Sequence, residues 1–177
     1  MLEDLSLHIL DVAENSIAAN ARRVTIRVEE LVSKDRLVLE IADNGRGMRP
    51  EELSRALDPF FTTKKAKRTG LGLPLLAQAA RAAGGKATVR SQPGRGTKVR
   101  ATFCLGHIDL QPLGDVAETL AVLMVAHPEV HFRYAHKTET GNYIFRSHSG
   151  RARSRPGNIS EIKKSIRGGI AGVRRKS

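Results

Sequence analysis

The 177-residue sequence has little that would stabilise a secreted or membrane protein. It contains one cysteine, Cys104, and no tryptophan, and aromatic residues make up only 4% of the chain. A single cysteine excludes a disulfide framework and favours a reducing compartment, so we expect a cytoplasmic protein. The first ten residues, MLEDLSLHIL, carry acids where a signal peptide carries bases, and no apolar run approaches the ~20 residues of a membrane span. Secretion and membrane insertion are therefore not expected.

Negative charge is also scarce. The chain has 30 lysines and arginines against 18 aspartates and glutamates, which gives a net charge of +12. Ten of these bases, and only one acid, lie in residues 145–177, which are also rich in glycine and serine. We expect residues 149–177 to form a basic, disordered tail whose simplest role is solubility. A nucleic-acid partner is possible only through this tail, although it lacks the interleaved aromatics of a binding module.

The first 20 residues predict an amphipathic helix, because apolar residues recur there at helical spacing. Its polar side carries His8, Asp11 and Asn15, which lie within about 60° of one another at 100° per residue. His8 could act as a phosphoacceptor or orient Asp11, but we expect it to be an ordinary surface histidine.

The following segments predict a sheet with helices. Alternating apolar and polar residues indicate strands, and helical spacing with proline and glycine punctuation indicates helices. The strands are expected at 22–29, 36–42, 86–91 and 97–105, and the helices at 51–57 and from a glycine-rich entry at 70–73 to about residue 83. This order predicts an α/β (α+β) two-layer sandwich over residues 1–106, with a mixed, largely antiparallel sheet and helices on one face.

Residues 107–148 follow a different pattern. Helical spacing over 115–126 and two alternating segments over 130–137 and 142–147 predict a helix and a hairpin. We interpret this part as an extension that packs on the sandwich. The spacing of His127, His131 and His136 does not predict a metal site.

Four short segments carry polar and glycine residues of the kind found in binding sites. The first is Asp11-Val-Ala-Glu-Asn15, which places a carboxylate and an amide one turn apart on a helix. The others are DNGRGM at 43–48, TGLGL at 69–73 and GRGT at 94–97, which lie at a strand end, a helix start and a strand start. Each segment alone is a weak signal.

Their chemistry points to one kind of ligand. A helix that begins with glycines offers free backbone N–H groups and a positive dipole end to phosphate oxygens. Asp43, at a strand end, can accept a hydrogen bond from an exocyclic amine such as that of adenine. The amide oxygen of Asn15 suits Mg²⁺, and Asp11 can orient or deprotonate a nucleophile.

In order and spacing, the four segments resemble the N, G1, G2 and G3 boxes of the GHKL ATPase superfamily, named for gyrase, heat-shock chaperone, histidine kinase and mismatch-repair ATPases. The resemblance covers about residues 2–105 and is strongest to the catalytic domains of histidine kinases. PFFTTKK at 59–65 resembles their F box, and the sequence from Gly70 to Thr97 resembles the stretch after that box. The fold that this implies is the Bergerat ATP-binding fold.

The resemblance also implies a role for each matching residue. Asn15 would be the Mg²⁺ ligand and Asp43 would recognise adenine. The pocket around the base would be shaped and supported by Gly45, Gly47 and Thr97. The phosphates would lie over Gly70, Leu71, Gly72 and Leu73, and a lysine of the lid, one of Lys64, Lys65 and Lys67, would neutralise their charge.

The chain departs from a sensor kinase in two ways. The first helix begins almost at Met1, so we expect a stand-alone domain without a phosphoacceptor domain. Histidine kinases generally have asparagine at the position of Asp11, whereas the ATPases and anti-sigma kinases have a glutamate that acts as general base. This carboxylate favours activation of water or of a hydroxyl group.

The function expected from the sequence is that of a Mg-ATP-binding protein of the histidine-kinase-like ATPase type. It would hydrolyse ATP, or transfer its γ-phosphoryl group to a protein partner, in cytosolic regulation. One alternative is a regulatory module that binds ATP without hydrolysing it. The other is a nucleic-acid-associated protein that acts through its basic tail.

Overall fold

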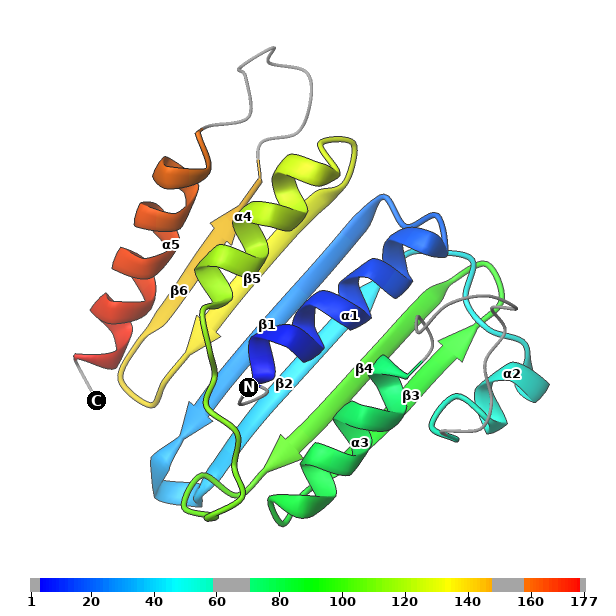
Figure 1. The fold of residues 1–177 in the computed structure, drawn as a ribbon, viewed down its shortest axis with the longest axis horizontal. Helices are drawn as coiled ribbons and strands as arrows, with labels where there is room; N and C mark the ends of the chain where they lie inside the picture. Colours follow the sequence, from blue (N-terminus) through cyan, green and yellow to red (C-terminus); the bar gives the residue numbers. More distant parts are fainter. Residues whose placement is uncertain (1–3, 59–70, 148–157, 176–177) are drawn as a thin grey trace.

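Six strands form one mixed sheet in the order β3-β4-β2-β1-β5-β6 (Figure 1). This computed structural model describes residues 4–58, 71–147 and 158–175. Neighbouring strands are antiparallel except β1 and β5, which are parallel. The strands are β1 (Arg23–Leu31), β2 (Arg36–Asp43), β3 (Lys86–Gln92), β4 (Gly96–Phe103), β5 (His131–Lys137) and β6 (Asn142–Arg146).

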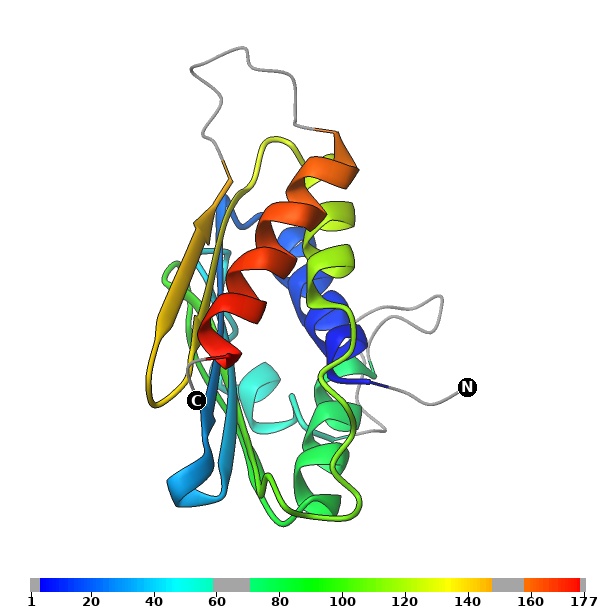
Figure 2. The same cartoon turned by 90° about the vertical axis from the view of Figure 1, so that its left-hand side faces the viewer.

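Helices cover one face of this sheet, as the side view in Figure 2 shows. They are α1 (Leu5–Ala18), α2 (Pro50–Ser54), α3 (Gly72–Ala82), α4 (Val116–Ala126) and α5 (Ile159–Arg174), with a short 3-10 turn at Val32–Lys34. The predicted two-layer sandwich with helices on one face is therefore confirmed. The described strands and the first four helices begin and end within a few residues of the predicted positions.

The core lies between the two layers, and strand alternation sets its position. Val24, Ile26 and Val28 of β1 point toward the helices and are fully buried, as are Leu5 and Ile9 of α1. Residues of β1 between them point to the other face. Successive side chains of a strand point to opposite faces. Every second residue of a strand therefore contributes to the core, and the residues between them form a second, open face.

Residues 107–147 continue both layers of the sandwich. Strand β5 pairs in parallel with β1 and extends the sheet, and α4 lies beside α1 in the helix layer (Figure 1). The helix and hairpin thus lie at the predicted positions, but they belong to the same sheet and helix layer as residues 1–106. In the described part of the chain, no helix is long and apolar enough to cross a bilayer.

The prediction of a disordered tail is wrong for residues 159–174, which form α5. Tertiary packing explains why these residues form a helix. The glycines of α5 do not prevent the helix from packing against the rest of the protein. The ring of Tyr143 fills the space that a side chain on Gly169 would occupy, so glycine lets α5 approach β6 closely. The side of α5 that faces the rest of the protein carries apolar residues at helical spacing: Ile162, Ile166, Ile170 and Val173.

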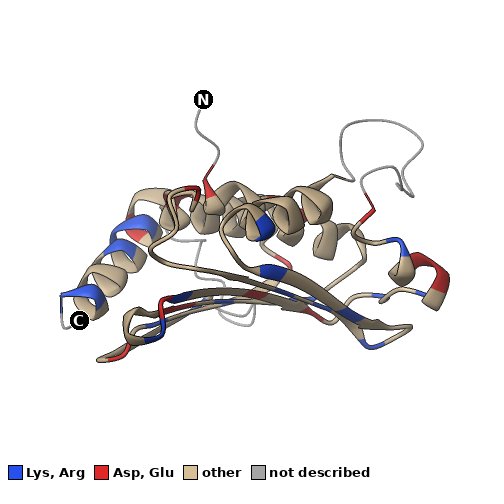
Figure 3. Ribbon diagram, turned by 90° about the horizontal axis from the view of Figure 1, so that it is seen from below, with Lys and Arg blue, Asp and Glu red and all other residues tan. Residues whose placement is uncertain are grey.

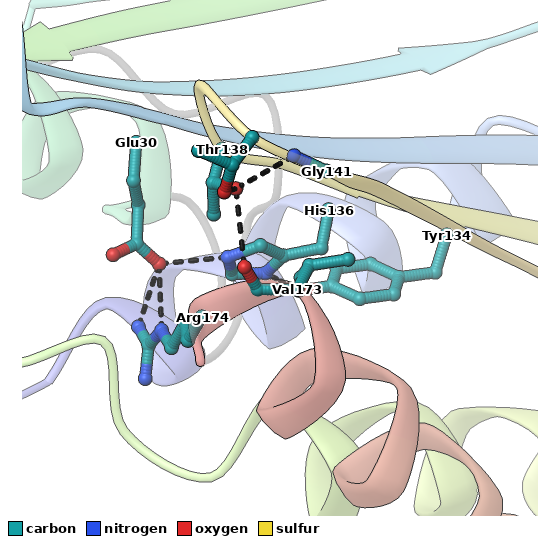
Figure 4. A network of polar contacts seen from close by, with 8 residues as sticks. Glu30, Tyr134, His136, Thr138, Gly141, Val173 and Arg174 are labelled. Atoms are coloured by element: carbon teal, nitrogen blue, oxygen red, sulfur yellow. Dashed lines mark hydrogen bonds and ion pairs between the residues drawn. The ribbon is translucent and has the colours of Figure 1, made fainter. Parts of the chain in front are cut away.

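A polar network fixes the C-terminal end of α5 to the sheet (Figure 4). Arg174 donates hydrogen bonds from Nε and Nη2 to Oε1 of Glu30, at 2.9 and 2.7 Å. Nε2 of His136 lies 2.7 Å from the same oxygen, and the Tyr134 hydroxyl lies 2.7 Å from Nδ1 of His136. A carboxylate accepts hydrogen bonds and does not donate them, so Nε2 carries a proton and, in the neutral ring, Nδ1 accepts from Tyr134.

The same end of α5 is held by Thr138, whose hydroxyl donates to the carbonyl of Val173 at 3.2 Å.

The polar network also determines the charge of the Glu30 carboxylate. Burial alone would raise the pKa of Glu30, but the hydrogen bonds from His136 and Arg174 and the positive charge of Arg174 hold that pKa below its ordinary value. Glu30 is therefore a carboxylate anion at neutral pH, neutralised by the chain's own cation.

His8 differs from its expected place on the surface, because only 4% of the residue is exposed. Its Nε2 lies 3.0 Å from Oε1 of Gln111, in the segment that joins β4 to α4. That segment crosses the N-terminal end of α1, where the N–H of Leu5 donates to the carbonyl of Pro112 at 2.9 Å. The connection to α4 thus covers a side of α1 that the sequence pattern indicated to be solvent-exposed.

Candidate functional site

The carboxylate of Asp43, at the end of β2, joins the second and fourth segments selected from the sequence to helix α1. Its Oδ2 accepts a hydrogen bond from the hydroxyl of Ser16 on α1, at 2.7 Å. Its Oδ1 accepts from the backbone N–H groups of Gly45 and Thr97, at 2.8 and 3.2 Å. The second and fourth segments therefore meet at one side chain, which also binds Ser16, the residue that follows the first segment.

Close backbone contacts hold the second and fourth segments together. Gly47 has a φ of +69°, and a Cβ there would overlap the backbone at the end of β3. A Cβ on Gly96 would overlap the backbone of Asp43. The N–H of Gly94 donates to the carbonyl of Arg46 at 2.7 Å, which ties the β3–β4 turn to the turn after β2. These glycines are required because backbone lies where side chains would be.

The third segment meets the first at Asp11. A Cβ on Gly72, the first residue of α3, would lie only 2.8 Å from the Cβ of Asp11. Asp11 is exposed, and Asn15 lies one turn further along α1 and is half-buried. The start of α3 therefore lies directly beside the carboxylate of α1.

The sequence predicts an anion site at the start of α3. Leu71 is the residue before the helix and is 41% exposed, Gly72 is buried, and Leu73 packs partly against the core. The first N–H groups of any α-helix lack intrahelical acceptors, and the helix dipole places positive charge there. Gly70 and the lid lysines Lys64, Lys65 and Lys67 lie outside the described residues.

Two residues of this cluster were missed in the sequence, namely Ser16 and Ser91. The hydroxyl of Ser91 donates to the carbonyl of Gly96 at 2.9 Å and accepts from the N–H of Met48 at 2.8 Å. Its oxygen also lies 2.8 Å from the hydroxyl of Thr97. A signal did exist for Ser16, because it lies on the apolar side of α1, where a buried hydroxyl requires a partner.

The three hydrogen bonds to Asp43 do not use all of its acceptor positions. A carboxylate offers about four acceptor positions, two on each oxygen. The two N–H groups fill Oδ1 and Ser16 takes one position of Oδ2, so one position remains for an N–H donor from outside the chain. The residue is half-buried and can therefore be reached.

A family model described as histidine kinase-, DNA gyrase B-, and HSP90-like ATPase matches residues 2–107. The sensor protein kinase FleS of Pseudomonas aeruginosa is 42% identical over 110 residues, which cover 62% of this chain and 27% of FleS. The sensor histidine kinase ZraS of Salmonella typhimurium is 38% identical over 89 residues, 50% of this chain and 19% of ZraS. The matched region is thus less than a third of the length of either relative.

Two solved structures share the fold. The N-terminal domain of a DNA repair protein superposes with a TM-score of 0.60 and 15% identity, over 90% of this chain and 55% of that chain. The MutL ATPase domain of Aquifex aeolicus, solved with ADP, has a TM-score of 0.52 and 14% identity, over 95% of this chain and 70% of that chain. Since both superpositions cover at least nine-tenths of the chain, the likeness in fold extends beyond residue 107.

Proposed function

This chain belongs to the family of histidine kinase-, DNA gyrase B- and HSP90-like ATPases, and on that premise we propose that it breaks the terminal phosphoanhydride bond of ATP. Membership implies ATP binding of the histidine-kinase type. The observation that carries the finer proposal is the exposed carboxylate of Asp11 beside the first residue of α3. The products would be ADP and either phosphate or a phosphorylated protein partner in a regulatory system.

In this proposal Asp43 recognises the adenine. Its free acceptor position takes the exocyclic amine, while Gly45 and Thr97 hold Oδ1 in place. Gly47 supports this site by letting the turn after β2 lie against the end of β3. A carboxylate held by neutral donors stays a good acceptor and rejects a carbonyl oxygen at the same position, so adenine is preferred to guanine.

The phosphates are placed at the start of α3. The N–H groups of Leu71, Gly72 and Leu73 would donate to their oxygens, and the resemblance assigns Gly70 and Lys64 to the same task. Asn15 would hold Mg²⁺ through its amide oxygen, because this ion binds few protein oxygens and completes its shell with water and phosphate. When bound, Mg²⁺ would neutralise charge on the transferring group.

Asp11 then orients the attacking oxygen and accepts its proton. Asp11 lies on α1 one turn before Asn15 and beside Gly72, so it would lie near both the amide proposed to hold Mg²⁺ and the helix start proposed to bind the phosphates. A water molecule as nucleophile gives hydrolysis, and a hydroxyl group of a partner gives phosphoryl transfer. Such proton transfer contributes typically ~10²–10⁴-fold to a rate.

The test follows the label of γ-labelled ATP mixed with Mg²⁺ and the protein, in wild type, Asp11→Asn and Glu14→Gln. Glu14 is the matched control, because it is an exposed carboxylate on the same helix that contacts His127, at 3.2 Å. We expect wild type and Glu14→Gln to release or transfer the label, and Asp11→Asn to bind ATP but to be slower by about 10²-fold or more.

Two results would contradict the proposal. If Asp11→Asn released label as fast as wild type, the carboxylate would have no chemical role. If wild type bound ATP and left it intact, also with protein partners added, the chain would be a regulatory module that binds nucleotide without turnover.

A further inference from the structure

The face of the sheet opposite the helices, which we call the open face, is strongly basic. By ladder register, one row across all six strands consists of Arg90, Lys98, Ala42, Thr25, Arg133 and Arg146. Figure 3 shows lysines and arginines along the strands as well as on α5. Alternation places ten cations on this face in the described strands: Arg23, Arg27, Arg36, Lys86, Arg90, Lys98, Arg100, Arg133, Lys137 and Arg146.

Only two acidic residues of the described strands share the open face, and both are already paired. Glu29 binds Arg27 at 3.0 Å, and Glu40 binds Lys98 and Arg100 at 3.2 and 3.0 Å. The other seven cations make no ion pair with an acidic residue in the described ranges. The open face therefore has a large uncompensated positive charge, which attracts polyanions.

Protection of sheet edges does not explain this charge. Lysine and arginine on edge strands prevent sheets from associating with one another. Here unpaired cations also lie on interior strands, with Arg23 on β1, Arg36 on β2 and Arg133 on β5. Like charges on neighbouring strands repel one another, so the arrangement costs stability in the free protein.

Figure 2 shows the open face without a helix on it. We propose that it binds the sugar-phosphate backbone of double-stranded nucleic acid, without reading the base sequence. A sheet of six strands with about seven residues each is roughly 24 Å wide and 23 Å long. A duplex has one phosphate charge for about each 1.7 Å of its axis, so a face of this size meets many phosphates. Lysine and arginine on a stiff scaffold supply the contacts that such backbone binding needs.

The chemistry of the face decides between polyanions. Single strands are held mainly by bases that stack on aromatic rings, and protein partners by a central apolar anchor. The open face offers neither, because Val38 is only 1% exposed and Ile144 lies at the edge on β6. All aromatic residues of the described ranges lie on the helix-covered side of their strands: Phe103, Phe132, Tyr134, Tyr143 and Phe145.

Helix α5 is a poorer candidate for the same partner, although the sequence pointed there. Three of its cations form ion pairs with acidic residues: Lys163 with a residue of α4, Arg167 with the N-cap residue of α4, and Arg174 with a residue of β1. Neutralised side chains release fewer counterions on binding a phosphate backbone, so they contribute less affinity. The open face and not the helix therefore carries the proposed contact.

The experiment measures binding of the full chain to a fluorescent DNA duplex of about 20 base pairs over a series of salt concentrations. Affinity decreases as salt increases, so the slope of log K against log salt is negative. Its magnitude becomes smaller by about one for each phosphate that the protein no longer neutralises. The test variant replaces four cations of the open face by glutamine, and the control replaces four exposed cations elsewhere. The test positions are Arg36, Lys86, Arg133 and Lys137, and the control positions are Lys34, Arg81, Lys164 and Arg175.

We expect wild type and the control to bind with the same steep salt dependence. The test variant should bind at least about tenfold more weakly, with a salt slope smaller by about three to four. ATP binding by both variants shows that they are folded. A single strand of the same length, poly-glutamate and vesicles of anionic lipid serve as competing probes.

Several results would overturn the proposal. Equal loss of binding in test and control variants would assign the effect to net charge. Tighter binding of the single strand, of poly-glutamate or of the vesicles than of the duplex would identify another class of partner. Absence of a salt-dependent interaction with the duplex would leave the open face without this function.

Discussion

Two carboxylates on neighbouring strands, Asp43 on β2 and Glu30 on β1, occupy opposite ends of the helix-covered face. Val24 is the ladder partner of Asp43, so six residues of β1, roughly 20 Å, separate the two positions. Asp43 is held by neutral donors, a hydroxyl and two backbone N–H groups. Glu30 is held by a guanidinium and an imidazole.

This difference separates a ligand site from a structural one. Neutral donors fix the position of Asp43 without cancelling its charge, and they leave one acceptor position open. Arg174 cancels the charge of Glu30 and brings the end of α5 with it. Glu30, whose charge the chain neutralises, therefore stabilises the fold. Asp43, which the chain only positions, remains available to a ligand.

The largest expected effect is on nucleotide affinity in Asp43→Asn. The amide accepts at only one end, so it keeps either the N–H groups of Gly45 and Thr97 or the donors that share Oδ2, Ser16 and the nucleotide amine; with the backbone N–H groups kept, it loses the nucleotide. A hydrogen bond to a charged group is worth about 1.5–3 kcal/mol, which lowers ATP affinity roughly ten- to hundredfold. Titration calorimetry measures the change.

Asp35→Asn is the matched control, because Asp35 lies just before β2 at its other end and accepts from the N–H of Gly106 at 2.7 Å. We expect it to bind ATP as wild type does. Unchanged ATP affinity in Asp43→Asn would show that the ligand position at this end of the sheet is wrongly assigned.

The second effect is on stability in Glu30→Gln. The amide oxygen of glutamine can still accept from Arg174 and His136, but the negative charge that strengthens these hydrogen bonds is lost, which costs about 1 kcal/mol of unfolding free energy. Urea denaturation measures this loss, and hydrogen exchange should show that α5 opens more easily. ATP affinity should stay as in wild type.

The neighbouring Glu29→Gln is the control, since Glu29 pairs with Arg27 on the open face. We expect it to change the unfolding free energy by no more than about 0.5 kcal/mol. The contrast between the two ends would fail if Glu30→Gln weakened ATP binding as much as Asp43→Asn.

The smallest effect is the acid dependence of that stabilisation. The folded-state pKa of Glu30 lies below its ordinary value of 4.5, so its contribution is complete above pH 4.5 and is lost as pH falls through the lowered value. The stability difference between wild type and Glu30→Gln should thus be constant from neutral pH to about pH 5 and disappear in stronger acid. Urea denaturation over a pH series measures it, and a difference that persists in acid would contradict the assignment.

Local patterns were enough to predict most elements. The strands around Ile26, Ile41 and Val99 alternate in the sequence as they do in the sheet, and the glycine-rich start of α3 was visible as TGLGL. Two predictions failed because packing partners decided them. The glycines of α5 indicated disorder, but Tyr143 lies against Gly169 and holds the helix, and His8 was expected at the surface, but Gln111 covers it.

The candidate site was predictable to the same extent. The sequence selected Asp11, Asn15 and Asp43 from residue type and spacing, because short segments determine which groups a helix face or strand end presents. It did not select Ser16 and Ser91, whose importance lies in contacts with Asp43 and Thr97. Contacts between segments far apart in the chain depend on tertiary packing, which local patterns do not encode.

The sequence by itself determined the family, the two-layer architecture and the side of each strand on which its cations lie, because alternation is a local property of extended backbone. Only the tertiary structure decided which strands become neighbours. That order brings Arg90, Lys98, Arg133 and Arg146 into one row, although they come from four separate strands. The sequence showed excess charge mainly near the C-terminus, whereas the fold concentrates unpaired charge on the open face, because strand pairing joins the same face of six strands into one surface.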